Sequence, residues 1–238
     1  MNLLLLHPAD FVAPDRVQIR DRRLAHLRAV LGVAPGSELR AGLLDGPLGT
    51  ATLMQLDTGM AEFTVTLDSP PPPPLAVSLI LALPRPKILR RVLRAATMLG
   101  VKEIHLLNSW RVDKSYWQTP LLAPERLRAE LLLGLEQALD TALPRVHIHR
   151  RFKPFVEDEL DAIAGARCRL VAHPRSADPL TGAPAGNPVL LALGPEGGFI
   201  AYEIDALVAC GFTPVALGPR VLTVEVALAA ALGRLSPL

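Results

Sequence analysis

Two short segments decide the fold of this chain: Leu193-Gly194-Pro195-Glu196-Gly197-Gly198 and Leu217-Gly218-Pro219-Arg220-Val221-Leu222. Each follows an apolar run that is typical of a buried strand, at 189–193 and 214–217. A stretch with helical apolar spacing follows each segment. The sequence therefore predicts two neighbouring strands that end in Gly-Pro bends. Because ligands of open α/β sheets bind outside the carboxyl ends of the strands, the two bends predict a slot for a small, flat molecule.

Glycine and proline give the two bends their properties. Glycine permits a positive φ and lets a ligand approach the main chain. Pro195 and Pro219 fix φ and remove an N–H group, so both bends are stiff. A stiff bend with exposed N–H and C=O groups can recognise an adenine edge without large side chains. The alternative is that both are ordinary strand-to-helix turns, but two similar bends favour a site.

A run of five prolines, Pro70-Pro71-Pro72-Pro73-Pro74, predicts a stiff linker between two domains. Before it, alternating stretches such as 37–41 and 62–67, with one helix near 21–32, predict a small β-rich domain over 1–69. After it, strands and helices alternate over 75–238, which predicts an α/β domain with a mostly parallel sheet. Its expected elements are 76–83, 86–99, 104–108, 124–140, 145–149, 155–164, 168–173, 189–193, 202–210, 214–217 and 224–235.

The composition bounds the class of protein. The chain has 238 residues, half of them hydrophobic, which suffices for one large or two small domains. The apolar start is too short for a signal peptide, and no apolar run reaches the length of a membrane span. We therefore expect no membrane partner. The two cysteines show no CxxC spacing, so we expect a protein of the reducing cytoplasm. The phosphate-binding loop of NTPases, the dinucleotide fingerprint, the GxSxG elbow and the HExxH motif are all absent.

A basic helix at 86–99 is the strongest candidate for contact with RNA. Lys87, Arg90, Arg91 and Arg94 recur at helical spacing and share one face. Because few carboxylates lie near this helix in the sequence, we give phosphate binding the same weight as a solvated surface. Such contacts would position RNA without reading its sequence.

Aromatic and basic residues gather in the loop 109–123. Rings beside cations suit stacking on an unpaired base, and we give this role the same weight as packing for Tyr116 and Trp117. For Trp110 we favour a ring that anchors the loop to the core. Lys114, Tyr116 and Trp117 therefore join the four cations of the helix as predicted RNA-binding residues.

His147 and His149 share one face of an expected strand. This spacing could begin a metal site, but no cysteine, aspartate or third histidine completes it nearby in the sequence. We predict no metal and interpret these residues as a polar strand face.

The segments GPEGG at 194–198 and LGPRVL at 217–222 resemble those of the RsmE family of RNA methyltransferases, in the SPOUT (α/β-knot) superfamily. Weaker similarities extend over essentially the whole chain. They are Leu99-Gly100-Val101, Glu136-Gln137, His173-Pro174-Arg175 and, in the N-terminal part, His26-Leu27-x-x-Val30-Leu31, Gly36 and Leu44-Asp45-Gly46. The resemblance implies an N-terminal small β-barrel (PUA-like) domain, a C-terminal domain with a trefoil knot, and a homodimer.

The resemblance also implies an activity, which is methyl transfer from S-adenosyl-L-methionine to N3 of a uridine in 16S ribosomal RNA of the small ribosomal subunit. It assigns the methyl donor to the two bends, with Arg220 and Glu225 as catalytic residues nearest the target base. The predicted donor-binding residues are Leu193, Gly194, Pro195, Glu196, Gly197, Leu217, Gly218, Val221 and Leu222. From the residues alone, Glu196 and Glu225 stand where acids stabilise helix starts.

Some polar positions depart from the family pattern. Thr223-Val224-Glu225-Val226 stands where the family usually has Arg-Thr-Glu-Thr. Asp140 or a neighbour stands in place of the family's arginine a few residues after Glu-Gln, and Met98 replaces a glutamate. The missing arginine at 223 predicts weaker or redirected activity. The alternative is an RNA-binding or ribosome-assembly-binding protein of the same fold with altered or lost methyltransferase activity.

Overall fold

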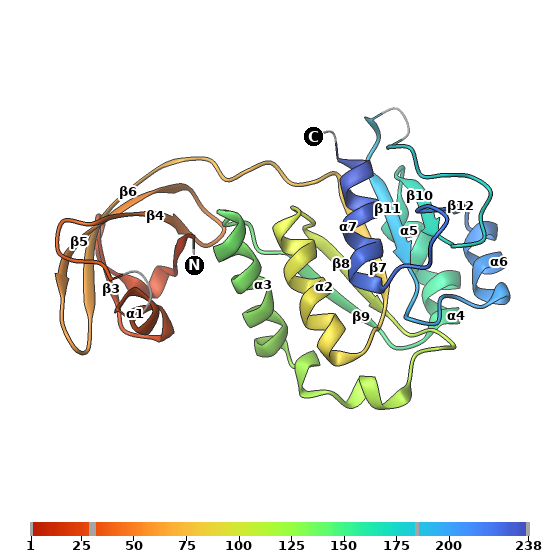
Figure 1. The fold of residues 1–238 in the computed structure, drawn as a ribbon, viewed down its shortest axis with the longest axis horizontal. Helices are drawn as coiled ribbons and strands as arrows, with labels where there is room; N and C mark the ends of the chain where they lie inside the picture. Colours follow the sequence, from red (N-terminus) through yellow and green to blue (C-terminus); the bar gives the residue numbers. More distant parts are fainter. Residues whose placement is uncertain (1, 29–31, 184–185, 237–238) are drawn as a thin grey trace. The chain divides into compact units, whose positions relative to one another are not determined.

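The computed structural model describes residues 2–28, 32–183 and 186–236 (Figure 1). The chain divides into two compact units. Unit 1 comprises Met1–Pro73 and Leu132–Leu143, and unit 2 comprises Pro74–Leu131 and Pro144–Leu238. The first boundary falls within the run of prolines, and the other two enclose the end of one helix.

Unit 1 is built on a six-stranded sheet of order β1-β4-β5-β6-β3-β2. The pair β1–β4 is parallel and the other pairs are antiparallel. The prediction of a β-rich part with one short helix is confirmed, although residues 29–31 of the expected helix lie outside the described residues. The elements are β1 (Leu4–Leu6), η1 (Pro8–Asp10), β2 (Phe11–Ala13), β3 (Arg16–Ile19), α1 (Arg22–His26), β4 (Glu38–Leu43), β5 (Leu48–Leu56) and β6 (Ala61–Ser69).

The segment Leu132–Leu143 belongs to unit 1 because it forms contacts with the start of the chain. The backbone N–H groups of Asn2 and Leu3 donate to the Glu136 carbonyl at 3.1 and 3.0 Å. Leu135 is fully buried with Leu3 in a small apolar cluster. The sequence did not predict this association, because its partners are far apart along the chain.

Unit 2 contains a six-stranded sheet of order β12-β10-β11-β7-β8-β9, and every pair in it is parallel. The predicted parallel sheet is therefore confirmed. Its strands are β7 (Val77–Ala82), β8 (Glu103–Leu107), β9 (Arg145–His149), β10 (Cys168–Ala172), β11 (Val189–Leu193) and β12 (Thr213–Val215).

The sheet of unit 2 is covered on both faces. Figure 1 shows α2 and α7 in front of it and α4 and α5 behind it. Strands β7 and β11 are accordingly buried along their whole length, as parallel strands in a layered α/β fold are. Among the helices within the described ranges, none is long and apolar enough to cross a membrane.

The helical elements begin and end close to the expected positions. The last two helices differ from expectation by at most one residue at either end. The helices are α2 (Pro86–Met98), η3 (Lys114–Gln118), η4 (Pro120–Leu122), α3 (Pro124–Ala138), α4 (Phe152–Pro154), η5 (Phe155–Glu159), α5 (Leu160–Ala164), α6 (Ala201–Ala209) and α7 (Val224–Leu235).

One expectation about the sheet is wrong. The two strands that end in Gly-Pro bends, β11 and β12, are not neighbours, because β10 lies between them and pairs with both. The turn at His173, which follows β10, therefore lies between the two bends. Three neighbouring strand ends, those of β12, β10 and β11, therefore replace the two that were expected at this part of the edge.

Candidate functional site

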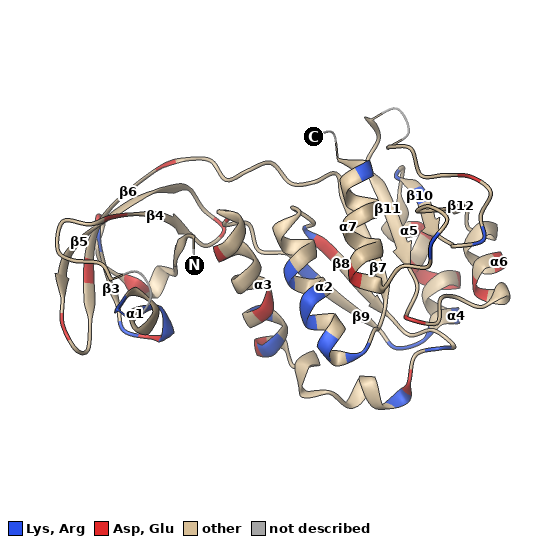
Figure 2. Cartoon of the chain, viewed as in Figure 1, with Lys and Arg blue, Asp and Glu red and all other residues tan. Residues whose placement is uncertain are grey.

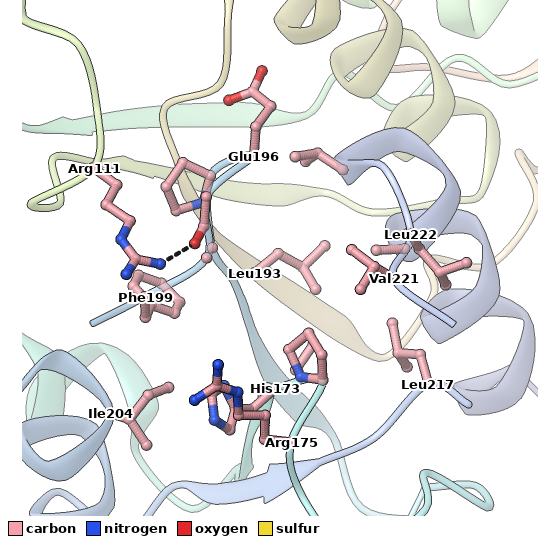
Figure 3. A pocket seen from close by; sticks show the side chains of 18 of the residues that line it. Arg111, His173, Arg175, Leu193, Glu196, Phe199, Ile204, Leu217, Val221 and Leu222 are labelled. Carbon is pink, nitrogen blue, oxygen red and sulfur yellow. Dashed lines mark hydrogen bonds between the residues drawn. The ribbon is translucent and has the colours of Figure 1, made fainter. Parts of the chain in front are cut away.

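A cavity of about 690 Å³ lies at the carboxyl ends of β10, β11 and β12 (Figure 3). Both Gly-Pro bends line it, together with the His173-Pro174-Arg175 turn and the start of α6. All nine residues predicted to bind the methyl donor line this cavity, and so does Arg220. The residues are Leu193, Gly194, Pro195, Glu196, Gly197, Leu217, Gly218, Val221 and Leu222.

The first bend is closed tightly on itself. The Gly198 N–H donates to the Pro195 carbonyl at 2.8 Å, and Gly198 has φ of +72°. A Cβ atom added at Gly194 would lie 3.0 Å from the backbone nitrogen of Phe199. Since backbone atoms cannot move aside as a flexible side chain can, position 194 favours glycine.

Arg111 fixes the first bend through a hydrogen bond from a loop distant in sequence. Its guanidinium donates to the Gly197 carbonyl, and a Cβ added at Gly197 would lie 2.9 Å from its Cδ (Figure 3). Arg111 also lines the cavity. The sequence does not predict Arg111 as a pocket residue, because it follows β8 and lies far from the bend along the chain.

Glu196 connects the first bend to α2. Its Oε1 accepts from the backbone N–H of Arg85, the residue before α2, at 3.0 Å. The Arg85 Nε donates to the Tyr116 hydroxyl at 3.2 Å, and this hydrogen bond raises the pKa of Arg85. The acid therefore caps the start of α2, a helix distant in sequence, instead of the turn that follows it.

The second bend leaves its backbone polar groups available. Its base is fixed, because the Ala216 N–H donates to the Asp178 carbonyl at 2.7 Å. Within the described ranges, residues 217–222 form no backbone–backbone hydrogen bond. Gly218 has φ of +123°, and a Cβ there would meet no atom within 4 Å. A ligand in the cavity therefore meets free main-chain donors and acceptors.

The cavity walls are mostly apolar. In Figure 3, Leu217, Val221 and Leu222 lie on one side, with Phe199 and Ile204 on the other. The polar side chains that line it include Arg111, His173, Arg175, Glu196, Asp205 and Arg220. An apolar cavity with a few placed polar groups is the usual form of a small-molecule site.

Glu225 does not line this cavity. Its Oε1 lies 3.5 Å from Nη1 of Arg91 on α2, and the side chain is 23% exposed. Its Oε2 is buried and has no hydrogen-bond partner among the described residues. Glu225 directly follows Val224, a cavity residue, in the first turn of α7.

Figure 2 shows Lys and Arg positions along α2. The four predicted RNA-binding residues of this helix are exposed, but three of their charges are paired. Glu130 on α3 lies 3.5 Å from Arg90 Nε and 2.6 Å from Arg94 Nε. Together with the Arg91–Glu225 pair, these contacts overturn the expectation of few neutralising carboxylates, because the partners come from helices distant in sequence. Lys87 forms no ion pair with any residue that the structure describes.

The aromatic loop differs from expectation at Trp110. Its ring is 79% exposed, so it does not anchor the loop. The attachment is made instead by its backbone N–H, which donates to the buried Glu203 at 2.7 Å. Trp117 is half-buried and donates to Asn108 Oδ1 at 2.7 Å, with the guanidinium of Arg150 over its ring at 5.2 Å. Lys114 is exposed and Tyr116 half-buried.

A third histidine does lie near His147 and His149, contrary to expectation. Because β8 and β9 pair in parallel, His105 stands directly beside His147, and their rings stack at 4.7 Å between centroids. The pairing of the two strands could not be read from the sequence.

The comparisons with known proteins agree with the fold and the pocket. The family model for an RNA methyltransferase domain matches residues 71–236. The ribosomal RNA small subunit methyltransferase E of a Synechocystis strain is 31% identical, over 95% of this chain and 76% of that protein. The Treponema pallidum protein of the same name is 28% identical, over 97% and 89%.

Solved structures show the same fold. The ribosomal RNA small subunit methyltransferase E from Neisseria gonorrhoeae, bound to S-adenosyl methionine, superposes with a TM-score of 0.76 at 23% identity, covering 98% of this chain and 95% of that one. A putative methyltransferase from Legionella pneumophila, in complex with its bound cofactor SAM, gives the same values. The resemblance carried by the two Gly-Pro segments is thus confirmed, and the chain belongs to the ribosomal RNA small subunit methyltransferase E family of RNA methyltransferases.

Proposed function

We propose that this chain transfers the methyl group of S-adenosyl-L-methionine to N3 of a uridine in 16S ribosomal RNA. The observation that carries the proposal is the single cavity formed by the two Gly-Pro bends, with the main chain of 217–222 available to a ligand. The membership of the chain in its family supports the same reaction.

The residues of the cavity fit the methyl donor. Gly218 leaves open space beside the main chain, where any larger residue would place a side chain. Apolar walls suit an adenine ring, and free N–H and C=O groups suit its polar edge. The bound donor supplies a methyl carbon already activated by its sulfonium. The protein's task is to align that carbon with the base nitrogen, which is a proximity effect.

The proton on N3 of the uridine must leave as the new N–CH₃ bond forms. We assign this step to the neighbourhood of Arg220 and Glu225. The Arg220 guanidinium stabilises the negative charge that develops on the base, and the Glu225 carboxylate accepts the proton directly or through water. Thr223 stands where the family usually has an arginine, so one cation is missing, and we expect a slower reaction than in typical members.

We extend the proposal to the architecture and partners that the family implies. Residues 1–69 form a PUA-like RNA-binding barrel and residues 75–238 a knotted methyltransferase domain, joined by the linker 70–74. The strands of the mixed sheet all lie within 4–69 and those of the parallel sheet within 77–215, which supports this division, whereas residues 132–143 pack with unit 1. The proposal also implies a homodimer in the cytoplasm that acts on the small ribosomal subunit.

Two measurements test the proposed function. Calorimetry of the purified chain with S-adenosyl-L-methionine should show saturable binding. Nucleoside mass spectrometry of 16S ribosomal RNA from a strain lacking the gene should show the loss of one N3-methyluridine, restored by the purified protein. An unchanged modification map would contradict the proposal. Donor-independent RNA binding without methylation would favour an RNA-binding protein of the same fold.

Lys87 and Arg94 should behave differently although both lie on the basic face of α2. Lys87→Ala should weaken RNA binding a few-fold, because Lys87 has no carboxylate partner among the described residues. The slope of the logarithm of the RNA-binding constant against the logarithm of salt concentration should fall by about 1, the value for one phosphate contact. Arg94→Ala should lower the free energy of unfolding by about 1–2 kcal/mol, because it removes a charged hydrogen bond to the buried Glu130.

Filter binding at several salt concentrations, with urea unfolding of both variants, checks this prediction. Lys153→Ala is the control, since Lys153 is an exposed lysine that already pairs with Glu157. Equal effects of Lys87→Ala and Lys153→Ala on RNA binding would contradict the assignment of the α2 face.

A further inference from the structure

Strands β8 and β9 bring four ionisable side chains together at one edge of the sheet of unit 2. Their parallel register places His105 beside His147 and Leu107 beside His149. Because alternate residues of a strand point to the same face, Glu103 and His105 share a face with His147 and His149. None of these four residues lines the cavity at the Gly-Pro bends, so the proposed methyl transfer does not use them.

A chain of hydrogen bonds fixes the state of His105. His149 Nδ1 lies 3.0 Å from Oε2 of Glu159, and His149 Nε2 lies 3.1 Å from His105 Nδ1. The carboxylate can only accept, so His149 Nδ1 carries a proton, and in the neutral ring of His149 the other nitrogen, Nε2, is an acceptor. His105 Nδ1 must then donate, which leaves the lone pair of the neutral His105 ring on Nε2.

The lone pair of His105 faces another acceptor. His105 is 2% exposed, and its Nε2 is buried with no hydrogen-bond partner among the described residues. Oε1 of Glu103 lies 3.7 Å away. The other oxygen of Glu103 is held by the Ser78 hydroxyl at 3.0 Å and by Arg167 at 3.5 Å, which directs Oε1 towards the histidines. Two facing acceptors repel each other unless a cation, or a water molecule that donates to both, lies between them.

We propose that Glu103, His105 and His147 form a binding site for a divalent transition-metal ion of the zinc type. One ligand atom from each residue lies within 4.8 Å of the other two. Two imidazole nitrogens and a carboxylate oxygen suit zinc, with a water molecule as fourth ligand. The Glu159–His149–His105 chain is the kind of outer contact that orients a metal-binding histidine.

Metal binding requires one ring to turn. The rings of His105 and His147 are stacked with 15° between their planes, and because ring lone pairs lie in the ring plane, both cannot point at one ion in this arrangement. His105 is held by its hydrogen bond to His149. The side chain of His147 is 44% exposed and lies on the edge strand β9, so its ring can change rotamer without displacing packed neighbours. The Arg167 charge near Glu103 lowers the affinity but leaves Oε1 available.

Zinc titration of the full chain tests the site. After treatment with EDTA and removal of the chelator, competition with a chromophoric zinc indicator should give one zinc ion per chain. Cobalt(II) should give the intense visible bands of a tetrahedral site. His147→Gln and Glu103→Gln should each lower zinc affinity at least tenfold, while His26→Gln, a histidine of unit 1, should bind as the wild type does.

Unfolding curves of the metal-free variants show whether each variant folds, and His147→Gln replaces an exposed side chain, so it tests the site even if a buried variant does not fold. Zinc binding that is absent in the wild type, or equal in the wild type and His147→Gln, would overturn the proposal. Binding of the methyl donor in calorimetry should be the same with and without zinc, so this test is independent of the proposed function.

Glu159 acts in this site as a positioning residue. In Glu159→Gln the amide can donate to Nδ1 of His149, so the His105 ring is no longer held in one tautomer. Zinc affinity should fall roughly 10- to 100-fold, and the cobalt spectrum should change. Glu157→Gln is the matched control, because Glu157 lies on the same π-helical turn and pairs with Lys153 instead. An unchanged cobalt spectrum in Glu159→Gln would contradict the relay.

Discussion

Replacing Gly218 with alanine is expected to lower the affinity for S-adenosyl-L-methionine by about 100-fold, which corresponds to ~2.7 kcal/mol. Gly218 has φ of +123°, a conformation that alanine adopts only with strain, and its Cβ would occupy open space beside the cavity. The bend would relax away from its present shape, and the free main-chain groups of 217–222 would no longer be placed for the ligand. Calorimetry with the donor measures the effect.

Gly165→Ala separates this effect from backbone strain. Gly165, at the end of α5, also has a positive φ, of +52°, and a Cβ there would meet no atom within 4 Å. It does not line the cavity. Both variants should lose stability, by roughly 1 kcal/mol each, but only Gly218→Ala should lose donor affinity. Equal donor affinity in the two variants would show that the second bend does not hold the donor.

The cavity at the two Gly-Pro bends could be anticipated from the sequence because its main features are local. A Gly-Pro pair after an apolar run marks a strand end, whatever lies elsewhere in the chain. Helical spacing likewise located the helix at Val224–Leu235 without tertiary information. The order of the strands was not accessible, because parallel strands pair through backbone groups that are the same for every residue. The position of β10 between β11 and β12 is therefore known only from the structure.

Contacts between distant residues account for the remaining differences. Glu130 and Glu225 neutralise the arginines of α2 from other helices, so the sequence around α2 made this face look more basic than it is. His105 joins His147 for the same reason, through the pairing of β8 with β9. Trp110 is exposed although large rings are usually buried, because the loop is attached by its backbone to Glu203. No local pattern carries these contacts.

Replacing Glu225 with glutamine is expected to slow methyl transfer by roughly 100-fold or more, while donor affinity and stability change little. The buried Oε2 of Glu225 has no hydrogen-bond partner among the described residues. Among those residues, the side chain forms one ion pair, the 3.5 Å contact between its Oε1 and Arg91, whose side chain is largely exposed. A carboxylate oxygen without a partner contributes little to stability, which agrees with the proposed role of Glu225 in accepting the proton.

Glu125→Gln is the matched control for this change. Glu125 and Glu225 are each the second residue of a helix, α3 and α7, so both substitutions remove the same favourable interaction with a helix start. Single-turnover methylation of small ribosomal subunits, with urea unfolding, compares the two. Glu125→Gln should keep full activity. If Glu225→Gln also methylates at the wild-type rate, the proton of N3 leaves by another route, and Arg220 alone stabilises the charge on the base.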